Sequence, residues 1–92
     1  MINSLIIDVK DNVAVVIKEI EKGEEINYKF DNEEKTLIAK DNIKIYHKFA
    51  TKDIKKGDPI IKYGQHIGLA GIDIESGEHV HVHNVENHRE EL

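Results

Sequence analysis

The chain has 92 residues, no cysteine, and a formal net charge of −5 that results from 18 acidic and 13 basic residues. The length suits one small domain, and the lack of cysteine excludes disulfides, thiolate nucleophiles and zinc–thiolate sites. No nucleic-acid partner is expected, because phosphate binding needs clustered Lys and Arg and the only arginine is Arg89.

The apolar residues are mostly β-branched. There are 15 Ile and 7 Val against 4 Leu and 4 Ala. Such side chains pack well on strands and lose rotamer freedom in helices. No helical period lasts more than two turns, so we predict one mostly β domain over residues 1–92.

The N-terminal segment predicts two strands. Leu5, Ile7 and Val9 alternate with other residues, which is typical of a strand with one buried face. After a turn at residues 11–12, the apolar run 13–17 predicts a strand buried on both faces. Charged residues interrupt the segment, so it is neither a signal peptide nor a membrane span, and we expect a cytoplasmic protein without membrane contact.

The middle of the chain predicts a hairpin, and more strands follow. The runs EINYKF and KTLIAK flank DNEE, a turn sequence. Four later runs each predict a strand: NIKIYHKFA, PIIKY, HIGLAGI and HVHVH. The final VENHREEL is compatible with a terminal helical turn, and His88 within it is expected to face solvent.

The pattern AxxDIxxGxxI occurs twice, 20 residues apart, and a weaker copy precedes both. The copies are Ala50, Asp53, Ile54, Gly57 and Ile60; Ala70, Asp73, Ile74, Gly77 and Val80; and Val16, Glu19, Ile20, Gly23 and Ile26. Each predicts a corner with glycine at positive φ and an acid that accepts hydrogen bonds from turn amides. The same offset aligns Tyr63–Gly64 with His83–Asn84 and predicts similar bends there.

The run GEHVHVHN places histidines at every second position, 79, 81 and 83. Alternate residues of a strand share one side, so His81 and His83 can converge on one ion. A metal needs more ligands than two imidazoles, and we expect His47, His66 or a carboxylate from a partner to supply them. Alternatively, the three histidines line the solvated face of an edge strand that buries Val80 and Val82.

The run from His47 to Asn84 resembles the SAF domain of the altronate dehydratase and D-galactarate dehydratase family. The ending YGxxIGxAxxDIxxGxHVHxHN carries the likeness, which covers at least positions 36–88. The likeness is greatest to the separate small subunit or N-terminal domain of these enzymes, and the sulfolactate sulfo-lyase small subunit has the same layout. The family often has an IPxGHK pattern, whereas this chain reads IKIYHK at 43–48, which leaves the substrate open.

The resemblance implies a β-clip fold and a role beside a large dehydratase subunit that is encoded separately. The whole enzyme would eliminate water from an aldonate or aldarate to give a 2-keto-3-deoxy acid, with a divalent metal, Fe²⁺ or else Mn²⁺ or Zn²⁺. Within the motif, His81 and His83 are expected to bind the metal, and Asn84 and Gln65 the sugar acid. His79 is expected to be structural or peripheral.

His47 and Lys48 are the candidate catalytic pair. Removal of a proton next to a carboxylate needs a base, and a cation that stabilises the enediolate. Solvent-exposed roles for both residues are the alternative. For the whole chain, there are two alternatives to a dehydratase subunit. One is a non-catalytic SAF module that binds a carbohydrate or a partner, and the other is the small subunit of a sulfolactate sulfo-lyase. We expect little activity from the chain alone, and exposed strand edges favour a homo-oligomer.

Overall fold

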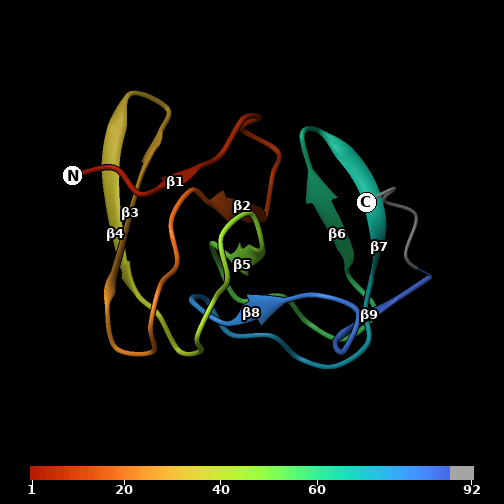
Figure 1. Ribbon diagram of the computed structural model, residues 1–92. Helices are drawn as coiled ribbons and strands as arrows, with labels where there is room; N and C mark the ends of the chain where they lie inside the picture. Colours follow the sequence, from red (N-terminus) through yellow and green to blue (C-terminus); the bar gives the residue numbers. More distant parts are fainter. Residues whose placement is uncertain (88–92) are drawn as a thin grey trace.

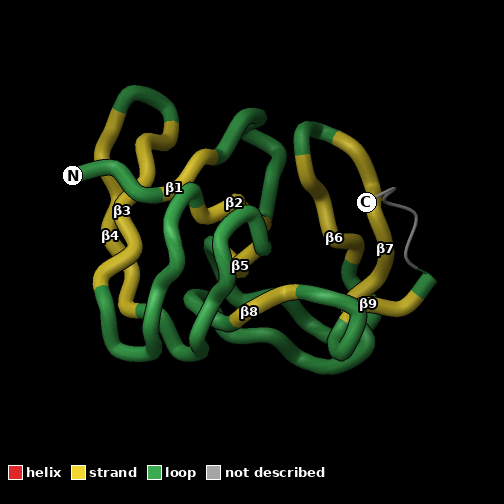
Figure 2. Tube along the Cα trace, in the orientation of Figure 1, coloured by secondary structure: helices red, strands yellow, loops and turns green. Residues whose placement is uncertain are grey.

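The computed structural model describes residues 1–87, and within this range nine strands are joined by turns and loops, without a helix (Figures 1 and 2). The strands are β1 (Ser4–Leu5), β2 (Val13–Val16), β3 (Glu25–Phe30), β4 (Glu33–Ile38), β5 (Lys48–Ala50), β6 (Pro59–Lys62), β7 (Gln65–Ala70), β8 (His79–Val80) and β9 (Val85–Glu86). The mostly β prediction is therefore confirmed. No helix in the described range is long and apolar enough to cross a membrane.

The strands form three antiparallel sheets. The central sheet has the order β1-β2-β5-β8, β3 and β4 form a separate hairpin, and the third sheet has the order β6-β7-β9. In Figure 1 the β3–β4 hairpin and the β6–β7 hairpin stand on opposite sides of the central strands. The central sheet thus lies between two hairpins, and it carries the residues of the candidate site.

Two apolar clusters fill the interior, and β2 contributes to both. Val13 belongs to the cluster that includes Ile60 of β6, whereas Ala14 belongs to the cluster that includes Ile26 of β3. All four residues of β2 are buried, as the apolar run 13–17 predicts, although Ile17 lies outside the strand and is 39% exposed. Successive residues of a strand point to opposite faces, so a strand between two cores has to be apolar throughout.

The repeated pattern forms corners that pair with one another. In one pair, the amide of Gly57 donates to the carbonyl of Ala70, and the amide of Gly77 donates to the carbonyl of Ala50. Ile54 and Ile74 form an isolated bridge between these corners. The predicted positive φ is confirmed at Gly23, Gly57 and Gly77, with values of 94°, 90° and 89°.

The weaker copy, which begins at Val16, pairs with a fourth corner that the sequence did not reveal. This corner runs from Ala39 to Phe49, and its Ile43 forms a bridge with Ile20. The amide of Gly23 donates to the carbonyl of Ala39, and the amide of Tyr46 donates to the carbonyl of Val16. Tyr46 has φ 68° and stands where the other three corners have glycine, which conceals the repeat.

The acidic residues of the corners cap the partner corner. Asp53 Oδ1 accepts a hydrogen bond from the amide of Ser76, and Asp73 Oδ1 accepts one from the amide of Lys56. The prediction that these acids bind turn amides is therefore confirmed, but the amides belong to the opposite corner. This exchange holds the two corners of a pair in register.

The predicted first strand is wrong in its extent and its face. β1 comprises only Ser4 and Leu5, and Ile7 and Val9 are 64% and 66% exposed. The buried residue is Ser4, because its hydroxyl donates to the carbonyl of Asn27, and Asn3 Nδ2 donates to the carbonyl of Glu25. Polar contacts with β3 therefore set the orientation of this segment, and apolar alternation does not.

Two further strand predictions need correction or completion. The run NIKIYHKFA contains strand residues only from Lys48 to Ala50, because a corner occupies its first half. The predicted hairpin is confirmed, with Asp31 and Asn32 as its two turn residues at positive φ. The terminal helical turn is wrong where the structure describes it, because Val85 and Glu86 form β9 and Asn87 is a bend with φ 53°; residues 88–92, with His88, lie outside the described residues.

Candidate metal centre

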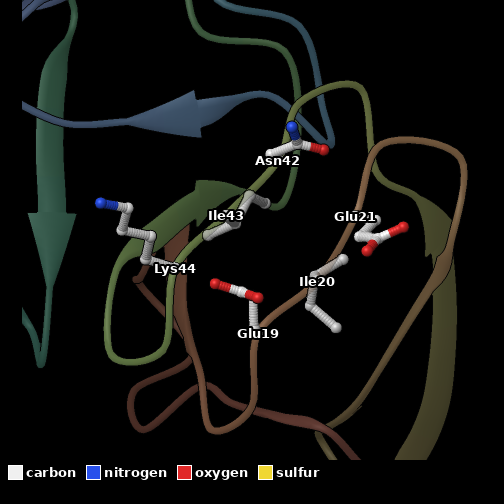
Figure 3. Close-up of a pocket in the computed structure, with 6 residues that line it drawn as sticks. All are labelled: Glu19, Ile20, Glu21, Asn42, Ile43 and Lys44. Atoms are coloured by element: carbon white, nitrogen blue, oxygen red, sulfur yellow. The ribbon is translucent and has the colours of Figure 1, made fainter.

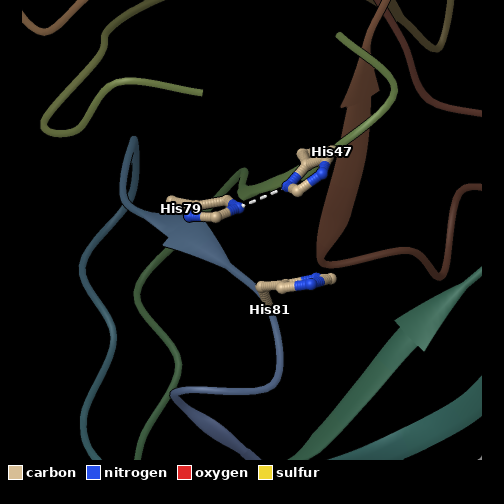
Figure 4. A group of neighbouring side chains, drawn as sticks. All are labelled: His47, His79 and His81. Atoms are coloured by element: carbon tan, nitrogen blue, oxygen red, sulfur yellow. Dashed lines mark hydrogen bonds between the residues drawn. The ribbon is translucent and has the colours of Figure 1, made fainter. Parts of the chain in front are cut away.

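Three half-buried histidines from two segments of the chain meet beside the central sheet (Figure 4). His47 Nδ1 and His79 Nε2 share a hydrogen bond of 2.9 Å. The ring centroids of His47 and His81 lie 4.7 Å apart, and those of His79 and His81 lie 5.6 Å apart. One nitrogen from each ring lies within 4.8 Å of the others, and we call these three residues the histidine cluster.

The pairing of β5 with β8 positions the cluster. Phe49 is the partner of His79 in this antiparallel ladder, so His47, two residues before Phe49, lies across from His81. The side chains of Phe49 and of the three histidines then belong to the same face of the sheet. Phe49 is fully buried in the core, whereas the imidazoles lie where that face reaches the surface.

The strand prediction for HVHVH is wrong beyond Val80, because the chain turns at residues 81–84. Asn84 makes the turn: its Oδ1 accepts from the amide of His81, and its Nδ2 donates to the carbonyl of His79. Val82, expected to be buried, is 59% exposed. The alternation of side chains that is typical of a strand therefore does not extend over the whole HVHVH run.

His79 lies in the middle of the histidines rather than at their periphery. Its ring stacks against His47 and His81, and its centroid lies 5.2 Å from that of the exposed His83. His83 is not part of the cluster of three. Sequence alone does not give the position of His79, because it depends on the partner strand, where Phe49 fixes the register.

The surroundings of His79 keep its imidazole neutral. Burial, and after it the charges of the neighbouring His83, His47 and His81 rings, together lower its pKa to about 4, against the opposing effect of Asp41. Asp41 Oδ2 also accepts a hydrogen bond from the amide of His79. A neutral imidazole at pH 7 has a lone pair that can bind a metal or accept a proton.

Lys48 lies on the other face of β5 from the cluster. The residue is 3% exposed, and it pairs with Val15 and Val80 in the sheet. Burial lowers the pKa of Lys48, and the pKa of Lys62 is lowered by burial and by the charge of Lys48. The predicted pair of His47 and Lys48 is therefore divided between two faces, because adjacent strand residues point in opposite directions.

The other predicted site residues lie apart from the cluster of three or serve the turn. Gln65 and His66 are exposed at the start of β7, and His66 lines a hollow of about 60 Å³ with Gly68, Leu69 and Asn87. Asn84 is buried, and the two polar atoms of its side chain bond to the backbone of the turn. Gly64 has positive φ as expected, and so does Tyr63, but Asn84, which was expected to make a similar bend, does not.

A larger hollow, of about 480 Å³, lies over the pair of corners that contains the fourth one (Figure 3). Its floor contains the buried Ile20 and Ile43. Figure 3 shows that Glu21 and Lys44 extend away from each other across the rim. None of the three clustered histidines lines this hollow.

The nitrogen donors of the histidine cluster suit a divalent metal, and the distances between these nitrogens are close to those that a metal requires. Imidazoles bind Fe²⁺, Mn²⁺ and Zn²⁺, and metal–nitrogen bonds of about 2.1 Å require nitrogens roughly 3–3.5 Å apart. The nitrogens of His47 and His79 already lie 2.9 Å apart, and the three-ring set spans up to 4.8 Å. Small ring rotations would close this difference, and three protein ligands leave positions for water or substrate.

Comparisons with known proteins agree with the resemblance in the sequence. Residues 2–88 match the model of the altronate/galactarate dehydratase SAF domain. The chain is 41% identical over 84 residues to altronate dehydratase of Bacillus subtilis and 42% identical over 82 residues to that of Escherichia coli. These alignments cover 90% and 89% of this chain, but only 16% of either dehydratase.

A third relative is matched over almost its whole length. It is (2R)-sulfolactate sulfo-lyase subunit alpha of Chromohalobacter salexigens, with 38% identity over 91 residues. The alignment covers 96% of this chain and 97% of the relative. The same domain thus occurs as a small part of one enzyme and as a named subunit of another.

Proposed function

The chain belongs to the family of altronate/galactarate dehydratase SAF domains, and we propose that it is the small, SAF-type part of a lyase that works with a large subunit. The proposed reaction is the elimination of water from an aldonate or aldarate to give a 2-keto-3-deoxy acid. The relatives named altronate dehydratase support the reaction type, and the relative named subunit alpha supports a separate partner. A cytoplasmic location stays a prediction.

The histidine cluster is the observation that carries this proposal. We propose that His47, His79 and His81 bind a divalent metal, Fe²⁺ or else Mn²⁺ or Zn²⁺, with His83 as a candidate further ligand. When bound, such a metal would polarise the carboxylate of the substrate as a Lewis acid. A role for His81 and His83 as ligands was expected from the motif, and His47 was expected to supplement them.

The elimination needs a proton acceptor as well. The C–H bond next to the carboxylate breaks, the electron pair forms a C=C bond, and the neighbouring C–O bond breaks as hydroxide takes up a proton and leaves as water. The resulting enol then becomes the 2-keto acid. In this proposal His47 is a ligand rather than the base, because its Nδ1 faces His79, and the base belongs to the large subunit.

The size of the domain also supports a partner. The Cα radius of gyration is 11.9 Å, and the cluster is only half-buried. A sugar acid bound there would remain in contact with water on one side. A second protein surface that covers the site would exclude that water and add the missing groups.

The proposal is tested by metal analysis and by reconstitution. The chain would be purified with its large subunit under anaerobic conditions, loaded with Fe²⁺, and offered altronate and galactarate. His79→Ala and His81→Ala are expected to lose metal and at least about 100-fold in kcat, whereas His66→Ala, the control, keeps both. If the two variants retain full activity, the chain acts as a non-catalytic binding module instead.

Sulfolactate is the second candidate substrate, and one observation favours it. The sulfo-lyase subunit alpha matches this chain over 97% of its length, whereas the dehydratases extend far beyond the match. Both reactions would need the same cluster and differ in the leaving group. A substrate screen that includes (2R)-sulfolactate beside the sugar acids distinguishes the two.

A further inference from the structure

The fourth corner, Ala39–Phe49, departs from the other three at two adjacent positions. In those three, a glycine at positive φ is followed by an acidic residue whose carboxylate accepts a hydrogen bond from the amide three residues before it: Glu24, Asp58 and Glu78. The fourth corner has Tyr46 and His47 at these positions. The backbone is nevertheless the same, because the amide of His47 donates to the carbonyl of Lys44, as in the other corners.

His47 has an evident reason for its place, since it joins the histidine cluster. Tyr46 has none inside this chain. Its φ of 68° is one that side chains with a Cβ seldom adopt, and its side chain is 71% exposed. Packing within the domain therefore does not compensate for the strained backbone, and glycine would serve the corner better. Strain of this kind is typical of functional positions.

Tyr46 is one of several exposed apolar residues that adjoin the cluster. Ile45 is 45% exposed, and Val82 is 59% exposed. Tyr46 directly precedes His47, and Val82 directly follows His81, so each lies one Cα–Cα step, about 3.8 Å, from a clustered histidine. We call Ile45, Tyr46 and Val82 the apolar rim.

We propose that the apolar rim is the surface on which the large lyase subunit docks, with Tyr46 as its anchor in an apolar pocket of that subunit. This inference rests on the proposed function. A half-buried cluster needs a cover and further ligands, and the residues next to it are the first that a cover would meet. The relatives point to the same occupant, because this domain is 16% of altronate dehydratase and elsewhere a named subunit.

Tyrosine suits this role in its chemistry. Buried Tyr side chains are common among the few residues that dominate protein interfaces, because they bury a large rigid area and lose little conformational entropy. The backbone at φ 68° fixes the direction of the Cα–Cβ bond of Tyr46 before the partner arrives, which lowers part of the entropic cost of binding. Burial against the partner would then compensate for the strain that is uncompensated in the separate chain.

The test measures the affinity of the chain for its large subunit, identified in the same genome by its likeness to the rest of altronate dehydratase. Tyr46→Ala and Tyr46→Gly are expected to weaken binding about ten-fold or more. Tyr63→Ala is the matched control, because Tyr63 also has positive φ, 55°, and is 50% exposed. It lies in the β6–β7 turn, which stands at the top of the view in Figure 1 whereas β8 lies below the centre, and should leave the affinity unchanged.

Thermal unfolding of the separate chain shows whether a variant has simply lost its fold. Tyr46→Gly is expected to keep or raise the midpoint of unfolding while it weakens binding, a combination that a purely structural role would not give. If Tyr46→Gly and Tyr46→Ala bind the large subunit as tightly as the natural chain does, the inference is wrong. It is also wrong if these variants abolish a homodimer and leave the affinity for the large subunit intact.

The inference and the function on which it rests fail in different ways. If the natural chain and the large subunit do not associate at all, the proposed function fails and takes the inference with it. If they associate and are active, but the rim variants behave like Tyr63→Ala, only the assignment of the docking surface fails.

Discussion

His47 Nδ1 lies 2.9 Å from His79 Nε2, although 32 residues separate the two in the chain. One of these nitrogens has to be protonated and the other unprotonated for the hydrogen bond to form. The bond therefore requires at least one neutral ring, and burial favours the neutral form of His79. The pair thus connects the stability of the domain to the protonation of the histidine cluster.

The first prediction concerns the acid stability of the metal-free chain. The pKa of His79 is lowered from 6.5 to about 4 in the folded state, so the unfolded chain binds a proton in this range when the folded chain does not. Stability should therefore be unaffected by His79 above pH 6.5 and decrease as the pH falls from 6.5 towards 4. The full shift corresponds to about 3 kcal/mol, and we expect about half, because a half-buried ring is screened by solvent.

Urea unfolding at a series of pH values, in the presence of a chelator, measures this effect. His79→Gln should be less sensitive to pH between 4 and 6.5 than the natural chain, and His66→Gln, which changes an exposed ring, should not. Equal slopes for His79→Gln and the natural chain would show that another group causes the acid sensitivity.

The second prediction concerns Lys48. Burial lowers its pKa, so the charged form destabilises the folded chain at neutral pH, and stability should rise as the pH approaches the ordinary lysine range. Lys48→Met should be neutral or stabilising by about 1 kcal/mol at pH 7. Because Lys48 and the cluster lie on opposite faces of β5, the metal affinity should not change.

A second signal comes from Lys62. Its pKa is lowered partly by the charge of Lys48, so Lys48→Met should move the pKa of Lys62 back towards the ordinary value. Nuclear magnetic resonance of the lysine side chains measures this change directly. A fall of ten-fold or more in metal affinity would contradict the placement of Lys48, and loss of activity at unchanged affinity would support the catalytic role expected from its motif.

The third prediction concerns Asn84, which ends the HVHVH run. Asn84→Ala removes a donor and an acceptor that bond to the backbone of His79 and His81, and should destabilise the chain by about 2 kcal/mol. The metal affinity should fall with it, since this turn holds His81. Asn84→Asp keeps the acceptor for the His81 amide and loses only the donor, so its loss of metal affinity should be smaller.

The repeat explains what could be predicted from the sequence and what could not. The corners at Gly57 and Gly77 were predicted correctly because a short local pattern determines them. The fourth corner was missed because Tyr46 replaces the glycine, and backbone contacts reveal the likeness: the hydrogen bond from the Tyr46 amide to Val16 and the bridge between Ile20 and Ile43. A residue that adopts a backbone conformation unusual for its type conceals the local sequence signal.

The candidate site was predicted only in part, because local sequence patterns determine only some of its features. Alternation correctly places His79 and His81 on one face, but it fails at His83, because the side chain of Asn84 bends the backbone there. The contribution of His47 depends on the pairing of β5 with β8, a contact across more than 30 residues that periodicity does not encode. Long-range register, rather than local pattern, is therefore what assembles the cluster.

The last prediction compares two glycines with almost the same backbone conformation. Gly57 and Gly77 have φ of 90° and 89°, but a Cβ at Gly57 would meet no atom within 4 Å, whereas one at Gly77 would lie 2.5 Å from the carbonyl oxygen of Ile38. Gly57→Ala should therefore cost about 1 kcal/mol, the cost of positive φ alone. Gly77→Ala should cost several times as much, about 3 kcal/mol or more, because a backbone carbonyl has to move.

Gly77 also precedes the cluster by two residues, and its carbonyl accepts a hydrogen bond from the amide of Lys40. Displacement of this corner would shift β8, so Gly77→Ala should lower the metal affinity, whereas Gly57→Ala should preserve it. Unfolding midpoints and metal titrations of the two variants test both statements. Equal losses of stability would mean that the corner at Gly77 relaxes freely, and the close contact with Ile38 would then not restrain the histidine cluster.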